Sequence, residues 1–191
     1  MNLRLRQATP ADAQAAAPLI AHAIGDIAQH MTGETEQEAV LQGLAALVEG
    51  DNTRHSYRYS HIAEKDGEVA GTLVLYFGAD ALELDQNLQA ALLKKGYHLP
   101  IEPEAHSDEW YIDTVSVNPD FQGQGIGTKL LEYAEKQAIE AGGSKLSPNV
   151  EVGKEGAIRL YERLGFRTAK PWTIIGQPFL HMVKHVSLPE E

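Results

Sequence analysis

The sequence contains no cysteine. This absence excludes disulfide bonds, a thiolate nucleophile and every metal site that is built on cysteine. The histidines, aspartates and glutamates are not grouped at metal-ligand spacings either, so we expect no metal. Any chemistry that the chain performs has to rest on its other polar groups.

Long hydrophobic runs are absent as well. No stretch reaches the roughly 18 apolar residues that a membrane-spanning helix requires, and the first residues do not form the apolar segment of a signal peptide. We therefore expect a cytoplasmic protein with no membrane partner.

Basic residues are scarce relative to acidic ones. The chain has 16 lysines and arginines against 27 aspartates and glutamates, a formal net charge of −11. An acidic protein repels phosphate backbones and attracts cations, which argues against a nucleic-acid partner and favours cationic substrates.

The chain has the length and composition of one globular domain. Its 191 residues are 43% hydrophobic and 23% charged, as is ordinary for a protein with a buried core. Because no internal repeat, low-complexity segment or linker interrupts it, we predict a single domain over residues 1–188 and a short tail at 189–191.

The most informative segment is a glycine-rich loop between a predicted strand and a predicted helix. A β-type run covers residues 110–117, and residues 128–138 are strong helix formers. The first turn of a helix has backbone N–H groups without intrahelical partners, and glycines let a ligand approach them closely. The loop is therefore predicted to hold a pyrophosphate. Its residues are Gln122, Gly123, Gln124, Gly125, Ile126 and Gly127.

The spacing of the glycines separates the candidate ligands. Both the dinucleotide fingerprint and the P-loop, counted from Gly123, require glycine at the position of Thr128. The pattern that the loop does match is Q/R-x-x-G-x-G/A, with Gln122, Gly125 and Gly127 at the specified positions. In this respect the segment resembles the acyl-coenzyme A loop of the GNAT superfamily of N-acetyltransferases.

A second motif further along the chain supports the resemblance. Residues 155–166 are similar to the closing helix of that family and the start of its next strand, A-x-x-L-Y-x-x-x-G-F. The apolar residues recur at the i, i+3, i+4, i+7 spacing of one helical face, and Gly165 stands where a helix ends. The two motifs occur in the family's order, and the resemblance is firmest over residues 110–167.

Periodicity and turn signals predict the remaining elements. Helices are expected at 10–30, at 35–49, within 82–95, from the glycine loop to about 142, and at 154–164. Strands are expected at 3–8, 56–64, 68–77, 110–117, 145–152, 165–171 and 178–187. This order and the resemblance imply an α/β (mixed α+β) domain of the GNAT type, with a central, mixed but largely antiparallel twisted sheet and helices on both faces.

One segment is peculiar to this chain. Residues 78–109 are expected to form a helix that ends at Gly96 and then a proline-rich loop. Members of the family usually join the flanking strands more directly, so the segment resembles an insertion. Long loops of this kind often form lids or substrate walls, and a solvated surface excursion is the alternative.

The resemblance implies acetyl-coenzyme A as the cofactor. Strand residues Val115, Ser116 and Val117 would present their backbone to the pantetheine arm, and an N–H near Val115 would bind the thioester oxygen. Gln122 would either contact the ligand or cap the loop. The pyrophosphate would lie on the backbone N–H groups of Gly123, Gln124, Gly125, Ile126, Gly127 and Thr128.

The resemblance also implies a general acid but leaves the general base open. Tyr161 stands at the position of the family tyrosine that protonates the leaving thiolate, although a tyrosine on this apolar stripe can also simply fill the core. Some relatives carry a glutamate where this chain has Asn149. Asp113 is therefore the candidate base, on a strand face that we expect it to share with Tyr111 and Val115. Alternatively, it binds the substrate ammonium or completes a structural hydrogen-bond network.

Further polar residues are weaker candidates. Lys154 replaces an asparagine of the family and either pairs with a cofactor phosphate or points to solvent. Asn149 and Gly153 are candidates for the cofactor side, and Pro148 fits the splayed strands that admit pantetheine in the family. Groups that could relay a proton through water are Glu109, His106, His22, Asp26 and His30.

The predicted function is transfer of the acetyl group of acetyl-CoA to a primary amine of a small molecule, a peptide or a protein. Acceptor and thioester would react directly in a ternary complex. The alternative is a non-catalytic acyl-CoA-binding sensor or scaffold, suggested by the replaced residues at 149 and 154. A nucleotide-binding domain is a third interpretation that rests on glycine content alone. Family analogy also allows a homodimer.

Overall fold

The structure is a computed structural model that describes residues 2–187. The tail predicted at 189–191 lies outside the described residues. Among the described residues, no helix combines the length and the apolar character needed to cross a membrane.

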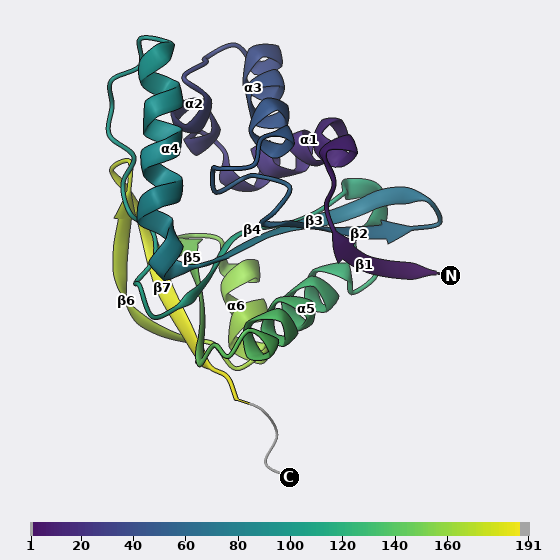
Figure 1. The fold of residues 1–191 in the computed structure, drawn as a ribbon. Coiled ribbons are helices and arrows are strands. Elements are labelled where there is room, and N and C mark those ends of the chain that lie inside the picture. The colour runs from purple at the N-terminus through teal and green to yellow at the C-terminus, as the bar shows by residue number, and fades with distance from the viewer. Residues whose placement is uncertain (1, 188–191) are drawn as a thin grey trace.

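One sheet of seven strands organises the fold, in the order β1-β2-β3-β4-β5-β7-β6 (Figure 1). Neighbouring strands run antiparallel except for the pair β4 and β5, which is parallel. The predicted mixed, largely antiparallel sheet is therefore confirmed. The strands are β1 (Leu3–Gln7), β2 (Ser60–Lys65), β3 (Glu68–Phe77), β4 (Trp110–Val117), β5 (Lys145–Glu151), β6 (Arg167–Ile174) and β7 (Gln177–His185).

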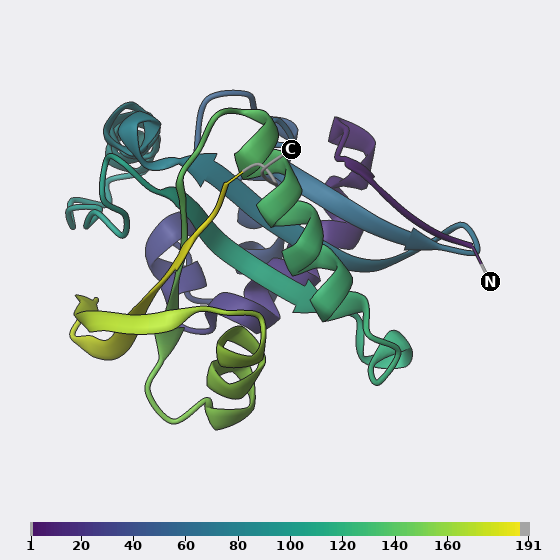
Figure 2. The same ribbon diagram turned by 90° about the horizontal axis from the view of Figure 1, so that it is seen from below.

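Helices cover both faces of the sheet, as predicted. Helices α1 (Ala13–Ile24), α2 (Ile27–Thr32) and α3 (Gln37–Glu49) lie on one face together with α4 (Ala81–Lys94) (Figure 1). The opposite face carries α5 (Ile126–Glu140), which crosses the strands in Figure 2, and α6 (Glu155–Arg163).

Two hydrophobic clusters follow from this layering. The first lies beneath α1 and α3 and includes Ile20, Leu44 and Tyr76, all buried. The second lies beneath α5 and α6 and includes Leu73 and Leu130. Strand β3 contributes to both clusters, which explains why its sequence is almost continuously apolar.

Two predicted boundaries differ from the structure by four residues or more. The helix expected at 10–30 ends at Ile24, because Gly25 takes a φ of +56° and starts a new helix, α2. The strand expected from residue 56 begins only at Ser60. The residues before it form turns because Thr53–Ser56 are buried as a polar loop rather than paired in the sheet.

A β-bulge in β4 changes which side chains share a face. Leu75 of β3 pairs with Ile112 and Val74 pairs with Thr114, so Asp113 is the extra residue. A bulge shifts the in-and-out alternation of side chains by one residue. Tyr111 therefore packs in the cluster beneath α1 and α3, whereas Val115 packs against the cluster beneath α5 and α6. The expectation that Asp113 shares a face with both residues was wrong.

The two parallel strands separate after a short contact. Strand β4 pairs with β5 only from Trp110 to Ile112, and the last partner is Pro148. Beyond this point β5 pairs with β7 and β4 pairs only with β3. The separation predicted from Pro148 is therefore present, and it opens the sheet between the last residues of β4 and β5.

The segment 78–109 folds back onto the protein. Helix α4 packs through Leu88 and Leu92 against Ile27 and Met31 of α2 and against the β6–β7 hairpin. The loop that follows α4 is fastened to the same hairpin, because Trp172 Nε1 donates to the Pro103 carbonyl at 3.2 Å. The segment therefore packs against α2 and the β6–β7 hairpin and does not extend freely into solvent.

Candidate active site

The glycine loop forms as predicted at the start of α5. Gly123 and Gly125 both have a φ of +76°, a conformation that favours glycine, and Gly125 caps the helix. A Cβ atom added to either residue would meet no atom within 4 Å. Glycine is therefore required here by backbone conformation, and the space above the loop is open to a ligand.

The loop exposes a row of free hydrogen-bond donors. The first helical bond runs from the Lys129 N–H to the Gly125 carbonyl at 3.1 Å. Within residues 2–187, no acceptor binds the N–H groups of residues 123–128. These amides lie at the positive end of the α5 dipole, so they can bind an anion. Lys65 Nζ contacts Gln124 Oε1 and adds a cation beside the loop.

A cleft brings several of the predicted site residues together. It lies between the end of α1, helix α2, the separated ends of β4 and β5, and α6. The start of α5 lies next to the end of β4, because a Cβ atom placed on Gly127 would be 3.7 Å from Val117 Cγ2. The predicted residues that line the cleft are Asp113, Val115, Asn149, Lys154 and Tyr161.

Tyr161 lies on the buried stripe of α6 and reaches this cleft. Its ring packs edge-on against Phe166, with the ring centroids 5.2 Å apart. No described residue forms a hydrogen bond with its hydroxyl. Burial raises the pKa of Tyr161 above its ordinary value, so the phenol stays protonated at neutral pH. A protonated, unpartnered hydroxyl suits the donation of a proton.

Asp113 is held in a buried network. Its side chain is 3% exposed, and its carboxylate lies 3.3 Å from Arg54 Nη1 and 3.3 Å from the Tyr76 hydroxyl. The Thr114 hydroxyl donates to it at 3.0 Å. Burial alone would raise the pKa of Asp113, but His55 and Arg54 outweigh that effect and hold it well below its ordinary range. Asp113 is therefore an anion throughout the neutral pH range.

Arg54 is the cation at the centre of this network, and the sequence offered no signal for it. Its side chain is 1% exposed and contacts carboxylates from three separate segments. Nη2 lies 2.7 Å from Asp85 of α4, and Nη1 contacts Glu104 of the following loop as well as Asp113. One guanidinium thus faces three carboxylates, and two of them come from the segment 78–109.

Asn149 continues the network toward β7. Its Nδ2 donates to the Glu104 carbonyl at 2.8 Å, and its Oδ1 lies 2.7 Å from His181 Nδ1. On the other side of the ring, His181 Nε2 lies 2.8 Å from Glu109. Burial opposes charge on Glu109, but the hydrogen bond and charge of His181 outweigh it and lower the Glu109 pKa. The Asn149 side chain is thus bound to protein groups.

His55 is the other site residue that sequence reasoning missed. It lies in the loop before β2, is 1% exposed and lines the cleft. Its Nε2 is 3.3 Å from Asp113 Oδ1, yet neither ring nitrogen has a hydrogen-bond partner among the described residues. A lone histidine in a polar loop has no local pattern that would have identified it.

The proposed proton relays lie elsewhere. His30 of α2 is buried between the Tyr97 hydroxyl, at 2.7 Å, and the Pro100 carbonyl, at 3.0 Å, so it fastens the segment 78–109. His22 and Asp26 are exposed at the end of α1. Glu109 and His106 belong to a separate pocket beside β7. The structure does not bring these residues together with Tyr161.

The pocket beside β7 contains a group of potential metal ligands that the sequence spacing did not reveal. Ligand atoms of His106, Glu109 and His181 all lie within 4.8 Å of one another. The ring nitrogen of His181 is already bound to Glu109 and lies 2.9 Å from the Ser147 hydroxyl. A buried ion pair therefore explains the arrangement.

Lys154 bridges the mouth of the cleft. Its Nζ lies 3.4 Å from Glu151 and 3.5 Å from the Ala23 carbonyl at the end of α1. The side chain is half-exposed, so it remains free to meet an anion that enters the cleft.

A family model and solved structures that match this chain identify the same family. The family model described as acetyltransferase (GNAT) family matches residues 24–166. A solved acetyltransferase is 34% identical, with 96% of this chain and 99% of that one covered and a TM-score of 0.79. An N-acetyltransferase from Staphylococcus aureus Mu50 shares the fold at a TM-score of 0.81 and 24% identity, over 95% of this chain and 100% of that one.

Curated relatives match over a shorter stretch. A ribosomal protein bS18-alanine N-acetyltransferase of Escherichia coli K12 is 39% identical over 62 residues, which are 32% of this chain and 42% of the relative. An N-acetyltransferase of Methanocaldococcus jannaschii is 37% identical over 75 residues, 39% of this chain and 31% of the relative. The aligned stretch is therefore less than half of each relative. The free amides of the glycine loop and the separated strands agree with the family-model match over residues 24–166. The chain belongs to the GNAT family of acetyltransferases.

Proposed function

We propose that the protein transfers the acetyl group of acetyl-CoA to a primary amine, by direct attack within a ternary complex. The observation that carries this proposal is the cleft itself. The cleft is lined by β4 residues and by Tyr161, whose hydroxyl is unpartnered among the described residues. The start of α5, where a row of backbone amides is free, lies close to Val117 of β4 and Leu160 of α6.

The residues around the cleft fit coenzyme A. The amides of residues 123–128 would hold the diphosphate, and Lys65 would add a positive charge beside Gln124. The edge of β4 over Val115–Val117 has no β5 partner and would align the pantetheine arm. A Salmonella typhimurium protein solved with its cofactor acetyl-CoA shares this fold at a TM-score of 0.60 and 18% identity.

The chemistry then needs an oxyanion donor and a general acid. Acetyl-CoA supplies a thioester carbonyl, and an N–H near Val115 would stabilise the negative charge that develops on its oxygen. Tyr161 would donate its phenolic proton to the departing sulfur. We propose that Asp113 acts through its neighbours rather than as the base, because its carboxylate is occupied by Arg54, Tyr76 and Thr114.

The acceptor is proposed to be cationic. Three carboxylates surround the single guanidinium of Arg54 beneath the cleft, so this buried region has an excess of negative charge. An ammonium group is attracted to such a region. The relative of Escherichia coli K12 is named for acetylating an alanine of a ribosomal protein, which supports including a peptide N-terminus among the acceptors.

The proposal is tested by measuring thiol release from acetyl-CoA with a panel of amines. The panel contains spermidine, Nα-acetyl-lysine amide and a peptide that begins with alanine, and an N-terminally acetylated copy of that peptide is the matched control. Amine-dependent thiol release with at least one member supports the proposal. Micromolar binding of acetyl-CoA by calorimetry without turnover on any amine would favour the non-catalytic sensor instead.

A further inference from the structure

The cleft reaches both faces of the sheet. Two residues that line it, Val115 and Ala157, pack against the hydrophobic cluster beneath α5 and α6. Two others, Ile24 and Tyr111, belong to the packing beneath α1 and α3. The glycine loop opens α5 and therefore lies on the first of these faces. A cofactor held by that loop would leave the part of the cleft beside α1 and α2 for the second reactant.

The part of the cleft between α2 and the β6–β7 hairpin is apolar. Its lining there consists of Ile27 and Met31 of α2 and of Ile174 and Phe179 of the hairpin, all members of one hydrophobic cluster. Ile24, half-buried at the end of α1, packs against the same cluster and lines the cleft as well. These five residues form the apolar end of the cleft. An apolar group that enters here leaves water, which favours its binding.

The segment 78–109 holds the apolar end in place. Leu88 of α4 packs in the same cluster, behind the α2 residues. Lys95 Nζ donates to the Thr32 carbonyl at the end of α2, at 3.2 Å. The hairpin is tied to the loop after α4 through the indole N–H of Trp172. Because α2 and the hairpin are both fastened to one segment, this end of the cleft is formed before a ligand binds, which reduces the entropic cost of binding.

Carboxylates line the cleft together with these apolar residues. Glu104 and Asp113 line it, and with a third carboxylate from α4 they share the single guanidinium of Arg54. The other two charged residues of the lining, Glu151 and Lys154, pair with each other. The excess of negative charge attracts an ammonium group, whereas the acyl chain of a longer acyl-CoA is uncharged and gains nothing from it. A ligand that is both apolar and cationic fits this combination.

We propose that the acceptor is a primary amine whose carbon skeleton carries an apolar group close to the nitrogen; this inference rests on the proposed acetyltransferase function. The apolar group lies between α2 and the β6–β7 hairpin, and the nitrogen points toward the thioester on β4. A free alkylamine and a peptide whose first residue is apolar present the same chemistry. Polyamines are poorer acceptors, because they place a second charge in the apolar end.

The experiment measures kcat/KM of the wild type with acetyl-CoA along two series of acceptors. The first series lengthens a primary alkylamine from propylamine to hexylamine, with spermidine as the polar reference. The second compares two peptides that are identical except that one begins with leucine and the other with serine. Burial of each methylene should raise kcat/KM about fourfold in the first series, until the apolar end is filled. The leucine peptide should exceed the serine peptide about tenfold or more. A rise in either series supports the proposal, and the series with the higher kcat/KM identifies the free amine or the peptide as the acceptor.

A substitution in the apolar end tests whether these residues cause the preference. Ile24→Gln should reduce the rise to less than about twofold per methylene, while the affinity for acetyl-CoA stays unchanged. Leu82→Gln is the matched control, because Leu82 is 71% exposed on α4 and does not line the cleft. If glutamine at position 24 prevents folding, Ile24→Ala, which only shortens the side chain, is judged by the same criterion.

The failure of this inference is distinguishable from the failure of the proposed function. A protein that acetylates amines but shows no rise in either series overturns the apolar acceptor and leaves acetyl transfer intact. The same holds if kcat/KM rises from acetyl-CoA to hexanoyl-CoA instead, because the apolar end then receives the acyl chain. A folded variant at position 24 with the slope of the wild type also overturns the inference. A wild type that acetylates no amine overturns the proposed function and, with it, this inference.

Discussion

Arg54 provides the sharpest test of how this cleft is held together. Replacing it with methionine keeps most of the side-chain length and removes the charge. Three carboxylates, whose side chains are 3–11% exposed, would then lose the cation that they share. Removing one member of a buried ion pair typically costs about 3–5 kcal/mol, because the remaining charge stays buried without a partner.

The expected effect is large enough to measure in two ways. At 191 residues, each kcal/mol shifts the melting temperature by roughly 2–4 °C, so Arg54→Met should lower it by roughly 6–20 °C. Urea unfolding at pH 7, followed by far-UV circular dichroism, gives the free energy directly. Adding Asp85→Asn to Arg54→Met should recover part of the loss, because one of the uncompensated charges disappears.

The loss of stability in Arg54→Met should depend on pH, because the pKa of Asp113 is lowered in the folded protein. A carboxylate whose pKa is lower in the folded state stabilises the protein above its ordinary pKa, and this contribution is lost as the pH falls through the folded value. Without Arg54 the folded state favours protonated carboxyl groups instead. The difference between wild type and Arg54→Met should therefore shrink as the pH falls below about 5.

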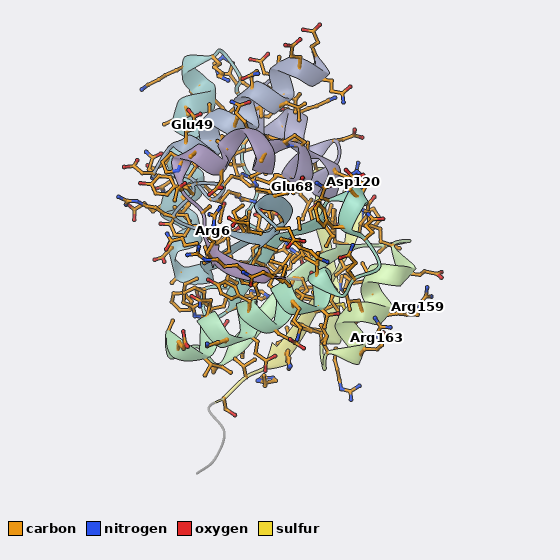
Figure 3. The ribbon with its side chains drawn as sticks, turned by 90° about the vertical axis from the view of Figure 1, so that its right-hand side faces the viewer. Arg6, Glu49, Glu68, Asp120, Arg159 and Arg163 are labelled. Carbon is orange, nitrogen blue, oxygen red and sulfur yellow. The ribbon has the colours of Figure 1, made fainter. Side chains whose placement is uncertain are left out.

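A surface arginine supplies the control. Arg159 extends outward from α6 (Figure 3), is 67% exposed and lies 3.6 Å from Glu155. Exposed pairs of this kind contribute about 0–1 kcal/mol, so Arg159→Met should leave stability nearly unchanged. If the free energies of unfolding of Arg54→Met and Arg159→Met differ by less than about 1 kcal/mol, the reasoning about the buried carboxylates is refuted.

Three further predictions concern the phenol, the loop and a buried histidine. Tyr161→Phe should lower kcat more than it weakens acetyl-CoA binding, and equal losses in both would remove the general-acid role. Gly125→Ala places a Cβ atom on a residue with a φ of +76°, which costs about 1–2 kcal/mol of conformational strain. Calorimetry should show acetyl-CoA binding about tenfold weaker in Gly125→Ala and unchanged in the control Gly156→Ala. Burial lowers the pKa of His61 from 6.5 to about 4, so the unfolded chain binds more protons between these values. The free energy of unfolding should rise by about 3 kcal/mol from pH 4 to 6.5 because of His61. An equal rise of the free energy of unfolding in His61→Gln would contradict this prediction.

The elements that the sequence predicted well are those with a local cause. The glycine loop follows directly from its neighbours, because a strand, a turn and a helix former meet there within a few residues. The stripe on α6 and the apolar run of β3 likewise depend on periodicity, which one segment carries by itself. The fold class and the family followed from these segments.

The errors arose where distant residues decide the local structure. The bulge at Asp113 depends on the register between β3 and β4, which no single strand encodes. The break at Gly25 reflects a glycine that adopts a positive φ in this fold, although glycines are also tolerated inside helices. The late start of β2 results from a polar loop that is buried only because other segments cover it.

By itself, the sequence determined the glycine-rich loop with its free amides, the tyrosine on the buried stripe of α6 and the layered order of strands and helices, since short-range backbone and periodicity rules govern all three. Only the tertiary structure decided the electrostatics of the cleft. Arg54 meets Asp113 across 59 positions, and His181 meets Glu109 across 72. Charges at such separations leave no pattern in the chain, and their partners are chosen by packing, because a buried charge is tolerated only where the fold brings an opposite one to it.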